Sequence, residues 1–320
     1  MSAHYFISAY ATSPSSDKWC PEDESRYFHG LANKPEVVGI EHPFLPQSDK
    51  YPLPWLLENI PENWSLIITA LPEFMNLLKG NPYFGLASVV EKDRMAAVKI
   101  MEDISDYIRK LNRGFGRKIV KAVHFHSLPR NVVNEMRGSK QALKQSLREI
   151  KDFNWDGAEL NLEHCDAYIP NQIADKGFLL LEDEIEVIST VGGYGIVLNW
   201  ARSAIEGRSV KKPLSHIEMV KNAGLFNGFF FSGCTDDVNS NYGYWRDTHM
   251  PPRNFINGDY LQSDGLLGID EVKQTMQELN NYDEDIYLGI KVSDLAADDN
   301  IDKKIGLNTE TIDALNYFIL

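Results

Sequence analysis

The sequence of 320 residues has few cysteines and no long apolar run. Its three cysteines, Cys20, Cys165 and Cys234, are widely spaced and odd in number, which fits neither a disulfide framework nor a zinc finger. No run approaches the roughly 18 apolar residues of a membrane span, and residues 1–11 lack the basic and apolar segments of a secretory signal. We therefore expect reduced thiols, a cytoplasmic location and no membrane partner.

Basic residues are also scarce. The 32 lysines and arginines are outnumbered by 46 acidic residues, and the net charge of −14 disfavours nonspecific nucleic-acid binding, which relies on a basic surface. The sequence has no P-loop, and its first apolar run continues as Ala9-Tyr10-Ala11-Thr12-Ser13 without the G-x-G-x-x-G fingerprint of a dinucleotide site. We expect no nucleic-acid partner, and the main structural rival, a two-domain dehydrogenase, lacks its signature.

Short apolar runs and amphipathic segments alternate along the chain. Eight runs have the length and composition of buried parallel strands: Tyr5–Ala9, Val37–Ile40, Leu66–Thr69, Ile119–Phe125, Ala158–Leu162, Gly195–Asn199, Gly228–Ser232 and Ile286–Val292. Apolar residues at helical spacing predict helices between and after them: Glu91–Leu111, Ser139–Phe153, Gly177–Val191, Ser215–Ala223, Ile269–Asn280 and Asn308–Leu320, the last capped by Asn308 or Thr309.

This alternation predicts the α/β class and a (β/α)8 TIM barrel, which typically needs about 250 residues. We expect residues 1–320 to form one such domain, because no linker rich in Gly, Ser or Pro interrupts them. Three connections are long for strand-to-helix turns: residues 43–64, 72–90 and 234–268. The third carries Tyr242, Trp245, Asp247 and His249, and it either closes over a polar ligand or packs as a surface loop on its own aromatic residues.

Polar residues recur where a barrel strand should be apolar. Because alternate side chains of a strand share a face, the apolar set should point to the helices and the polar set into the barrel. The inward set then comes from five strands: Glu41; His124 and His126; Glu159, Asn161 and Glu163; Asn199; Lys291. A single such residue is more often a satisfied core hydrogen bonder, but the convergence predicts a functional cavity at the strand ends.

The run Gly39-Ile40-Glu41-His42-Pro43, the segment Glu159-Leu160-Asn161-Leu162-Glu163-His164 and the order of eight strands resemble the xylose-isomerase-like barrels of sugar isomerases, epimerases and related endonucleases. The resemblance implies an isomerase or epimerase of a small sugar or sugar derivative. Arg202 lies where these families often place a substrate-binding His, and an Arg suits a phosphorylated or acidic substrate. The acidic charge disfavours the endonuclease activity.

In the metal-dependent relatives, a Glu on the fifth strand, an Asp on the sixth, a His on the seventh and a Glu on the eighth hold a divalent ion. Only Glu163 matches, since Asn199 and Lys291 replace two ligands and residues 229–234 contain no His. A metal such as Mn, Zn or Mg stays open through Glu163 with His124, or through a set that adds further donors: Glu41, His126, Asp247 or His249.

We hypothesise that Glu163 accepts or relays a proton while Lys291 and His126 stabilise developing oxyanion charge. The expected substrate-binding residues are Glu41, Asn161, Asn199, Trp200, Arg202 and His249. The alternatives are a lyase or aldolase in which Lys291 forms a Schiff base, a sugar-binding barrel without catalysis, and a buried Glu163–Lys291 ion pair that braces the barrel. By alternation His164 should face away from Glu163, and aromatic residues in the loops could serve a homodimer.

Overall fold

A computed structural model describes residues 3–15, 18–280, 285–295 and 300–318. Eight parallel strands close into a barrel in sequence order, from β1 through β8 and back to β1. Their bounds are β1 (Tyr5–Ile7), β2 (Val37–Pro43), β3 (Ser65–Thr69), β4 (Val120–Phe125), β5 (Glu159–Glu163), β6 (Gly195–Asn199), β7 (Phe226–Phe231) and β8 (Tyr287–Ile290). The predicted fold and all eight predicted strands are confirmed.

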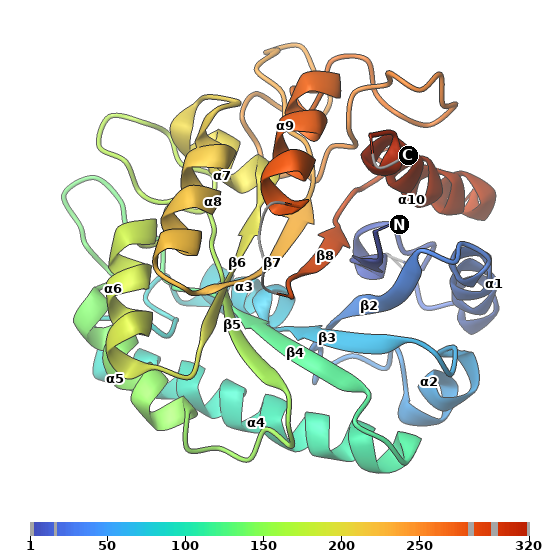
Figure 1. The fold of residues 1–320 in the computed structure, drawn as a ribbon. Helices are drawn as coiled ribbons and strands as arrows, with labels where there is room; N and C mark the ends of the chain where they lie inside the picture. The colour runs from blue at the N-terminus through green and yellow to red at the C-terminus, as the bar shows by residue number, and fades with distance from the viewer. Residues whose placement is uncertain (1–2, 16–17, 281–284, 296–299, 319–320) are drawn as a thin grey trace.

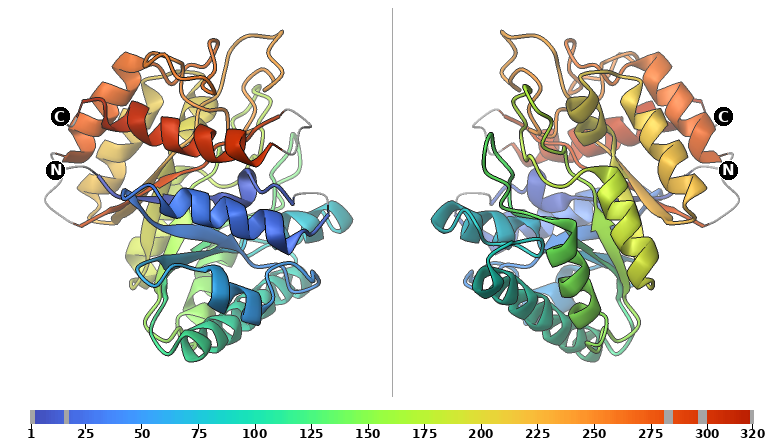
Figure 2. Two further views of the ribbon diagram at one scale, coloured as in Figure 1. Left: turned by 90° about the vertical axis from the view of Figure 1, so that its right-hand side faces the viewer. Right: turned by 90° about the vertical axis from the view of Figure 1, so that its left-hand side faces the viewer.

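Helices surround the barrel on its outside (Figures 1 and 2). They are α1 (Pro21–Ala32), α2 (Leu53–Asn59), α3 (Leu71–Gly80), α4 (Glu91–Phe115), α5 (Lys140–Ile150), α6 (Leu181–Val191), α7 (Trp200–Gly207), α8 (Lys212–Asn222), α9 (Ile269–Asn280) and α10 (Ile301–Asn316), with the 3-10 turn η1 (Ala9–Ala11) after β1. Helix α10 packs beside α1, which brings the two ends of the barrel chain together (Figure 2). In the described residues no helix combines the length and apolar character needed to cross a membrane.

Two details of the sequence-based assignment are wrong. The last helix begins at Ile301, seven residues before the expected start, and its cap is Asn300, whose side chain accepts a hydrogen bond from Lys303 N at 3.1 Å. Asn308 lies inside this helix and donates to Tyr27 Oη. Glycine is a poor helix former, so the presence of Gly306 argued against a helix in the residues that form the first turns of α10. The expected end of this helix at residues 319–320 lies outside the described residues.

The long connections also differ from expectation. Residues 43–64 contain α2 and residues 72–90 contain most of α3, both of which are short helices with a proline in the first turn. In contrast, residues 234–268 form neither helix nor strand, although isolated bridges such as that between Gly233 and Met250 fold them over the C-terminal side of β7. This third connection is therefore the one built as a long irregular segment.

Two apolar clusters hold the barrel. The larger one fills the space between the strands and the helices, and it takes the outward side chains of every strand. A smaller one closes the floor of the barrel: Phe6, Ile67, Ala122, Val197, Phe230 and Tyr287. These residues fill the N-terminal half of the lumen and exclude water from it. The polar side chains that follow them toward the strand ends therefore lie next to an apolar layer.

Candidate functional site

Strand alternation gathers six polar side chains at the C-terminal half of the lumen. This lumen cluster consists of Glu41, His124, His126, Glu163, Arg202 and Lys291, all of which have a relative exposure of 0%. Arg202 comes from helix α7, and the other five members come from strands or from the residue that follows one. Each of these five lies two positions after another inward-facing residue or at a strand end, as expected because alternate side chains of a strand share a face. The predicted inward face is confirmed for β2, β4 and β8 and, on β5, for Asn161 and Glu163. Glu159, which the sequence placed on the same face, is exposed at the start of β5 and lies 3.8 Å from Lys121 Nζ.

Glu41 anchors one side of the lumen cluster. Its Oε1 lies 3.1 Å from His124 Nδ1, and its Oε2 lies 3.0 Å from Lys291 Nζ. Ser8 Oγ donates to the same carboxylate. His124 Nε2, on the other side of the imidazole ring, lies 2.8 Å from Tyr287 Oη. This contact connects Glu41 and His124 to the apolar cluster at the floor of the barrel. Every oxygen of Glu41 is thereby engaged.

Glu163 anchors the other side. Its Oε2 lies 2.9 Å from His126 Nε2, and its Oε1 lies 2.5 Å from Arg202 Nη1. Lys291 Nζ is 3.7 Å from Glu163 Oε1, so one ammonium lies between the two carboxylates of the cluster. The ion pair that the sequence suggested between Glu163 and Lys291 is present, but Arg202 is the closer cation.

The 234–268 connection contributes a third carboxylate. Asp247 Oδ2 lies 3.1 Å from Arg202 Nε and 3.0 Å from the ammonium of Lys176, and its Oδ1 lies 3.1 Å from His249 Nδ1. The side chain of His249 is 20% exposed, whereas that of Arg202 is 0% exposed. A chain of charged groups therefore leads from the surface at His249 to Glu163 in the lumen.

Asn199 positions Arg202. Its Oδ1 accepts a hydrogen bond from the backbone N–H of Arg202 at 3.2 Å, which makes it the N-cap of α7, and it also accepts one from Ser232 Oγ at 2.8 Å. Several buried polar atoms at this end of the lumen have no hydrogen-bond partner among the described residues: His126 Nδ1, Asn199 Nδ2 and Arg202 Nη2. Buried polar atoms normally have partners, so at such a site these are candidates for contacts with a ligand.

The charged state of the cluster follows from its pairings. Burial alone would raise the pKa of Glu163, but Arg202 and Lys291 outweigh it and hold that pKa well below its usual range. Burial would lower the pKa of Lys291, but Glu163 and Glu41 outweigh it and raise that pKa. Burial lowers the pKa of His126 from 6.5 to about 4, against the opposing effect of Glu163. At neutral pH the two carboxylates are anions, Lys291 is an ammonium and His126 is neutral.

Two predicted site residues lie apart from this cluster. Asn161 is deeper in the barrel, where it donates to Tyr287 Oη at 2.8 Å and accepts from Asn227 Nδ2 at 2.9 Å. Trp200 is buried in the apolar cluster between strands and helices. Alternation could not place Trp200, because β6 ends at Asn199 and the helical period of α7 begins with the next residue.

Several residues at the site were not among the predicted set. Ser8 lies two residues after Phe6 on the inward face of β1, and Tyr287 lies two residues before Gly289 on the inward face of β8. Extending the alternation of inward residues along these two strands would have identified both. Tyr10 lies in η1, with Lys291 Nζ 5.5 Å from its ring centre. Lys176 comes from an irregular segment, and no periodic signal marks it.

The 234–268 connection covers the mouth beside β8. The backbone N–H of Ser293 donates to the carbonyl of His249 at 2.8 Å, and Tyr242 Oη donates to the carbonyl of Ser293 at 3.0 Å. Tyr242 also lines a polar cavity of about 850 Å³, together with Asp264 and Asp294. A ligand that reaches the lumen cluster from this side must displace part of the 234–268 connection.

Two groups of buried residues in the described part of the chain have the spacing to hold a divalent ion: Glu41, His124 and Glu163 in the lumen, and His164, Glu206 and His216 outside it. The lumen group does not fit one. Lys291 Nζ already lies between Glu41 and Glu163, at 3.0 and 3.7 Å, and Arg202 contacts Glu163 from the other side. A dication placed there would face two fixed cations within a buried site.

Comparison with solved structures places the fold. L-ribulose 3-epimerase superposes with a TM-score of 0.59 at 16% identity, covering 100% of this chain and 93% of that one. The IOLI protein, solved with a bound zinc atom, gives a TM-score of 0.61 at 14% identity and covers 99% of both chains. D-psicose 3-epimerase from Clostridium cellulolyticum H10 gives 0.59 at 13% identity, with 98% and 97% covered. The resemblance to the xylose-isomerase-like barrels is thus confirmed for the fold.

Sequence comparison gives the family. The chain is 36% identical over 249 residues to Uncharacterized protein STM3670 of Salmonella typhimurium (strain LT2), which covers 77% of this chain and 78% of that protein. Residues 6–307 match the family described as Domain of unknown function (DUF4862). That match includes strands β2 to β8, all of β1 except Tyr5, and the whole lumen cluster. The chain therefore belongs to the DUF4862 family.

Proposed function

We propose that this protein is an isomerase or epimerase that moves a proton on a small, uncharged sugar or sugar derivative. The observation that carries the proposal is the pair of His126 and Glu163, in which a neutral imidazole is held by a carboxylate through Nε2 while its Nδ1 has no partner among the described residues. Supporting it, several of the structural neighbours are sugar epimerases, including one described with D-tagatose.

The proton acceptor in this proposal is His126. Glu163 was the acceptor in the sequence-based hypothesis, but a carboxylate paired with both Arg202 and Lys291 is a weak base. The carboxylate instead fixes the ring of His126, keeps the proton on Nε2 and stabilises the imidazolium that forms when Nδ1 takes a proton. Glu163 is thus a positioning residue for His126.

The reaction balances without a metal. His126 Nδ1 takes the proton from the carbon beside the sugar carbonyl, and the electrons of that C–H bond form the double bond of an enediolate. Returning this proton from His126 to the neighbouring carbon, while a hydroxyl proton moves between the two enediolate oxygens, gives an isomer. An epimer forms when a water on the opposite face protonates the original carbon and the resulting hydroxide takes the proton that His126 holds. The N–H groups of Arg202 Nη2 and Asn199 Nδ2, which have no hydrogen-bond partner among the described residues, are available to bind the enediolate oxygens.

The charges of the site favour an uncharged substrate. Arg202, the residue that suggested a phosphate or carboxylate, is already balanced by Glu163 and Asp247. Lys291 is balanced by Glu41 and Glu163. A phosphate would have to break these pairs, whereas hydroxyl groups can use the remaining N–H donors. The same pairing keeps Lys291 protonated and disfavours it as a Schiff-base nucleophile.

Deuterium exchange tests the proposal. The protein is incubated in D2O with a panel of uncharged ketoses and aldoses and their phosphates, and exchange at the carbon beside the carbonyl is followed by NMR. We expect exchange with at least one uncharged sugar, and His126→Gln should reduce its rate by about 100-fold or more. A matched control is His42→Gln, since His42 is buried on the outer face of β2 against Tyr107.

Three results would contradict the proposal. Exchange that persists in folded His126→Gln would remove this residue from the reaction. Sugar that binds to the wild-type protein without exchange would identify a sugar-binding barrel without catalysis, and preference for sugar phosphates over the free sugars would contradict the assignment of Arg202.

A further inference from the structure

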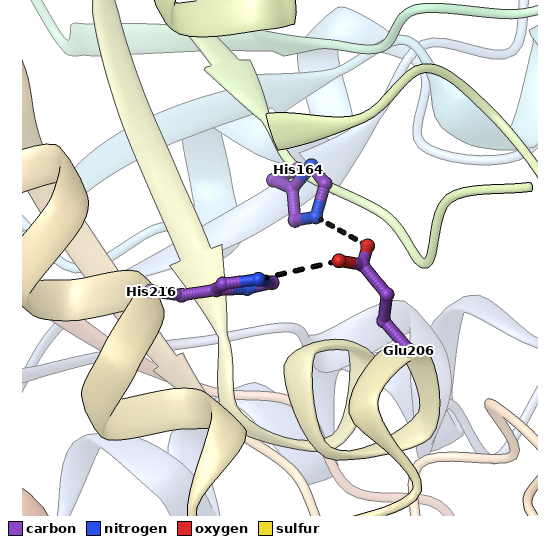
Figure 3. Close-up of side chains that lie close together, drawn as sticks. All are labelled: His164, Glu206 and His216. Carbon is purple, nitrogen blue, oxygen red and sulfur yellow. Dashed lines mark hydrogen bonds and ion pairs between the residues drawn. The ribbon is translucent and has the colours of Figure 1, made fainter. Parts of the chain in front are cut away.

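A second buried group of histidines and carboxylates lies outside the barrel, between the end of β5 and the helices that follow it. This outer cluster consists of His164, Glu184, Glu206 and His216, from β5's end, α6, α7 and α8. All four side chains are at most 3% exposed. Figure 3 shows both imidazoles directed at the carboxylate of Glu206, one toward each oxygen.

The distances suit a metal-binding group. His164 Nε2 lies 3.0 Å from Glu206 Oε2, and His216 Nε2 lies 3.3 Å from Glu206 Oε1 (Figure 3). Ligand atoms arranged as a tetrahedron at zinc bond lengths are about 3.3–3.6 Å apart. One nitrogen from each ring and one carboxylate oxygen all lie within 4.8 Å of one another. Small side-chain shifts would bring all three onto a common ion.

The second nitrogen of each ring is held as metal-binding histidines require. His164 Nδ1 lies 2.6 Å from Glu184 Oε2, and Glu184 Oε1 accepts from Ser127 Oγ. His216 Nδ1 lies 3.0 Å from Ser203 Oγ. A carboxylate or hydroxyl on Nδ1 fixes the ring and leaves the lone pair on Nε2 for the metal.

One atom of the cluster lacks a well-formed hydrogen bond among the described residues. His216 Nε2 is buried, and although it faces Glu206 it has no hydrogen-bond partner of adequate geometry among the described residues. Burying an imidazole nitrogen without a partner is costly. Coordination of a cation would satisfy this nitrogen and the facing oxygen of Glu206 together.

The charge of the cluster also favours a dication. With both imidazoles neutral, the carboxylates of Glu184 and Glu206 carry two negative charges, which one divalent ion balances.

Lys212, the lysine that contacts the outer cluster among the described residues, is loosely held. Lys212 approaches Glu206 Oε1 to 3.9 Å, but its side chain is 29% exposed and can turn to solvent. The lumen cluster, by contrast, contains its own buried ammonium and guanidinium. A dication at the outer cluster would thus meet no fixed buried Lys or Arg among the residues that contact the cluster in the described chain.

We propose that His164, Glu206 and His216 bind a divalent transition-metal ion of the Zn2+ type outside the barrel lumen, with Glu184 orienting His164. Two imidazoles and a carboxylate are a donor set that zinc accepts, and a water or the second oxygen of Glu206 would complete it. The ion would join β5, α7 and α8. These segments also carry Glu163 and Arg202 into the lumen, so the metal would stabilise the frame of the lumen cluster.

Zinc binding to the intact protein tests this inference. Protein stripped with a chelator is titrated with Zn2+ against a chromophoric competitor, and Co2+ is used as a spectroscopic probe. We expect one Zn2+ per chain and visible d–d absorption of the Co2+ form. His216→Gln should weaken Zn2+ binding by about 100-fold, while His124→Gln in the lumen should bind as the wild-type protein does. Circular dichroism checks that each variant is folded.

The outcomes separate the sites. Anomalous diffraction from the wild-type protein at the zinc absorption edge should place the ion beside His216, and this measurement decides the matter even if a variant fails to fold. An ion found beside His124, or weakened binding in His124→Gln but not in His216→Gln, would overturn the inference. So would the absence of Zn2+ binding to the stripped protein. None of these readouts depends on sugar turnover, so they stand apart from the proposed reaction.

Discussion

The lumen cluster and the outer cluster lie back to back on β5. Glu163 and His164 are neighbours in sequence, and alternation sends one side chain into the barrel and the other toward the helices. Both clusters bury carboxylates against imidazoles, yet among the residues that the structure describes only the lumen cluster also holds a buried Lys and Arg against its carboxylates. The comparison teaches that histidines and glutamates together do not define a metal site, because fixed cations nearby decide whether another cation can enter.

Removing the lumen ammonium should give the largest effect. Lys291→Met leaves Glu41 and Glu163 buried without the cation between them, and we expect the free energy of unfolding to fall by about 3–5 kcal/mol. Urea denaturation at neutral pH measures it. Lys99→Met is the control, since Lys99 is exposed on α4 and pairs only with exposed carboxylates among the described residues. Its effect should stay within about 0.5 kcal/mol.

A double variant sharpens this test. Glu163 keeps Arg202 at 2.5 Å in Lys291→Met, so Glu41 is the carboxylate that loses its cation. Adding Glu41→Gln to Lys291→Met removes this buried charge, so part of the lost stability should return. If Lys291→Met is as stable as the wild-type protein, the lumen cluster does not depend on its internal cation, and its contrast with the outer cluster fails.

Acid should weaken the lumen cluster with a smaller effect. Burial acts to raise the pKa of Glu41, but Lys291 and His124 outweigh it and lower that pKa to about 2. Because the folded protein holds this carboxylate ionised to a lower pH than the unfolded chain does, its contribution is complete above about pH 4.5 and is lost as the pH falls toward 2. Glu163 contributes in the same direction.

The measurement is the denaturant midpoint of unfolding, determined at a series of pH values between about 5 and 2.5. Glu41→Gln should show a shallower decline than the wild-type protein, whereas Glu102→Gln, a change on the exposed face of α4, should keep the wild-type slope. Equal slopes for all three proteins would mean that the Glu41 pairing adds no stability that depends on pH.

The sequence was sufficient for the barrel and for most of the inward polar residues that form the lumen cluster. Both follow from local periodicity, since buried strands are short apolar runs and alternate residues share a face. Thus the alternation alone assigns Glu41, His126, Glu163 and Lys291 to one cavity. It does not assign their pairings, because the distances between strands depend on the closure of the barrel and on side-chain rotamers.

Other residues lacked a periodic signal. Asp247 reaches Arg202 from an irregular segment 45 residues farther along the chain, so no local pattern links the two. The outer cluster joins four elements, and α7 had not been predicted. One signal was available, because Glu184 falls on the same helical face as Leu181, Val187 and Ile188, and all four are buried. A carboxylate within an apolar stripe needs a partner, and that partner is His164.

The smallest expected effect concerns the cation beside the outer cluster. Lys212 Nζ lies 3.9 Å from Glu206 Oε1 and would repel a metal bound there. Because its side chain is partly exposed, the repulsion amounts to about 0.4–1 kcal/mol, and Lys212→Ala should tighten Zn2+ binding about 2–5-fold. Competition with a chromophoric chelator measures this, and the gain should shrink as salt is added, since salt screens exposed charges.

The neighbouring Lys211, which is exposed at the start of α8, provides the control. Lys211→Ala changes the net charge equally but should leave Zn2+ affinity nearly unchanged, because a short-range repulsion depends on the distance to Glu206. Equal gains in both variants would show that overall charge governs binding. Weaker binding in Lys212→Ala would make this lysine part of the site, and the outer cluster would then resemble the lumen cluster, in which carboxylates keep a cation of the protein's own.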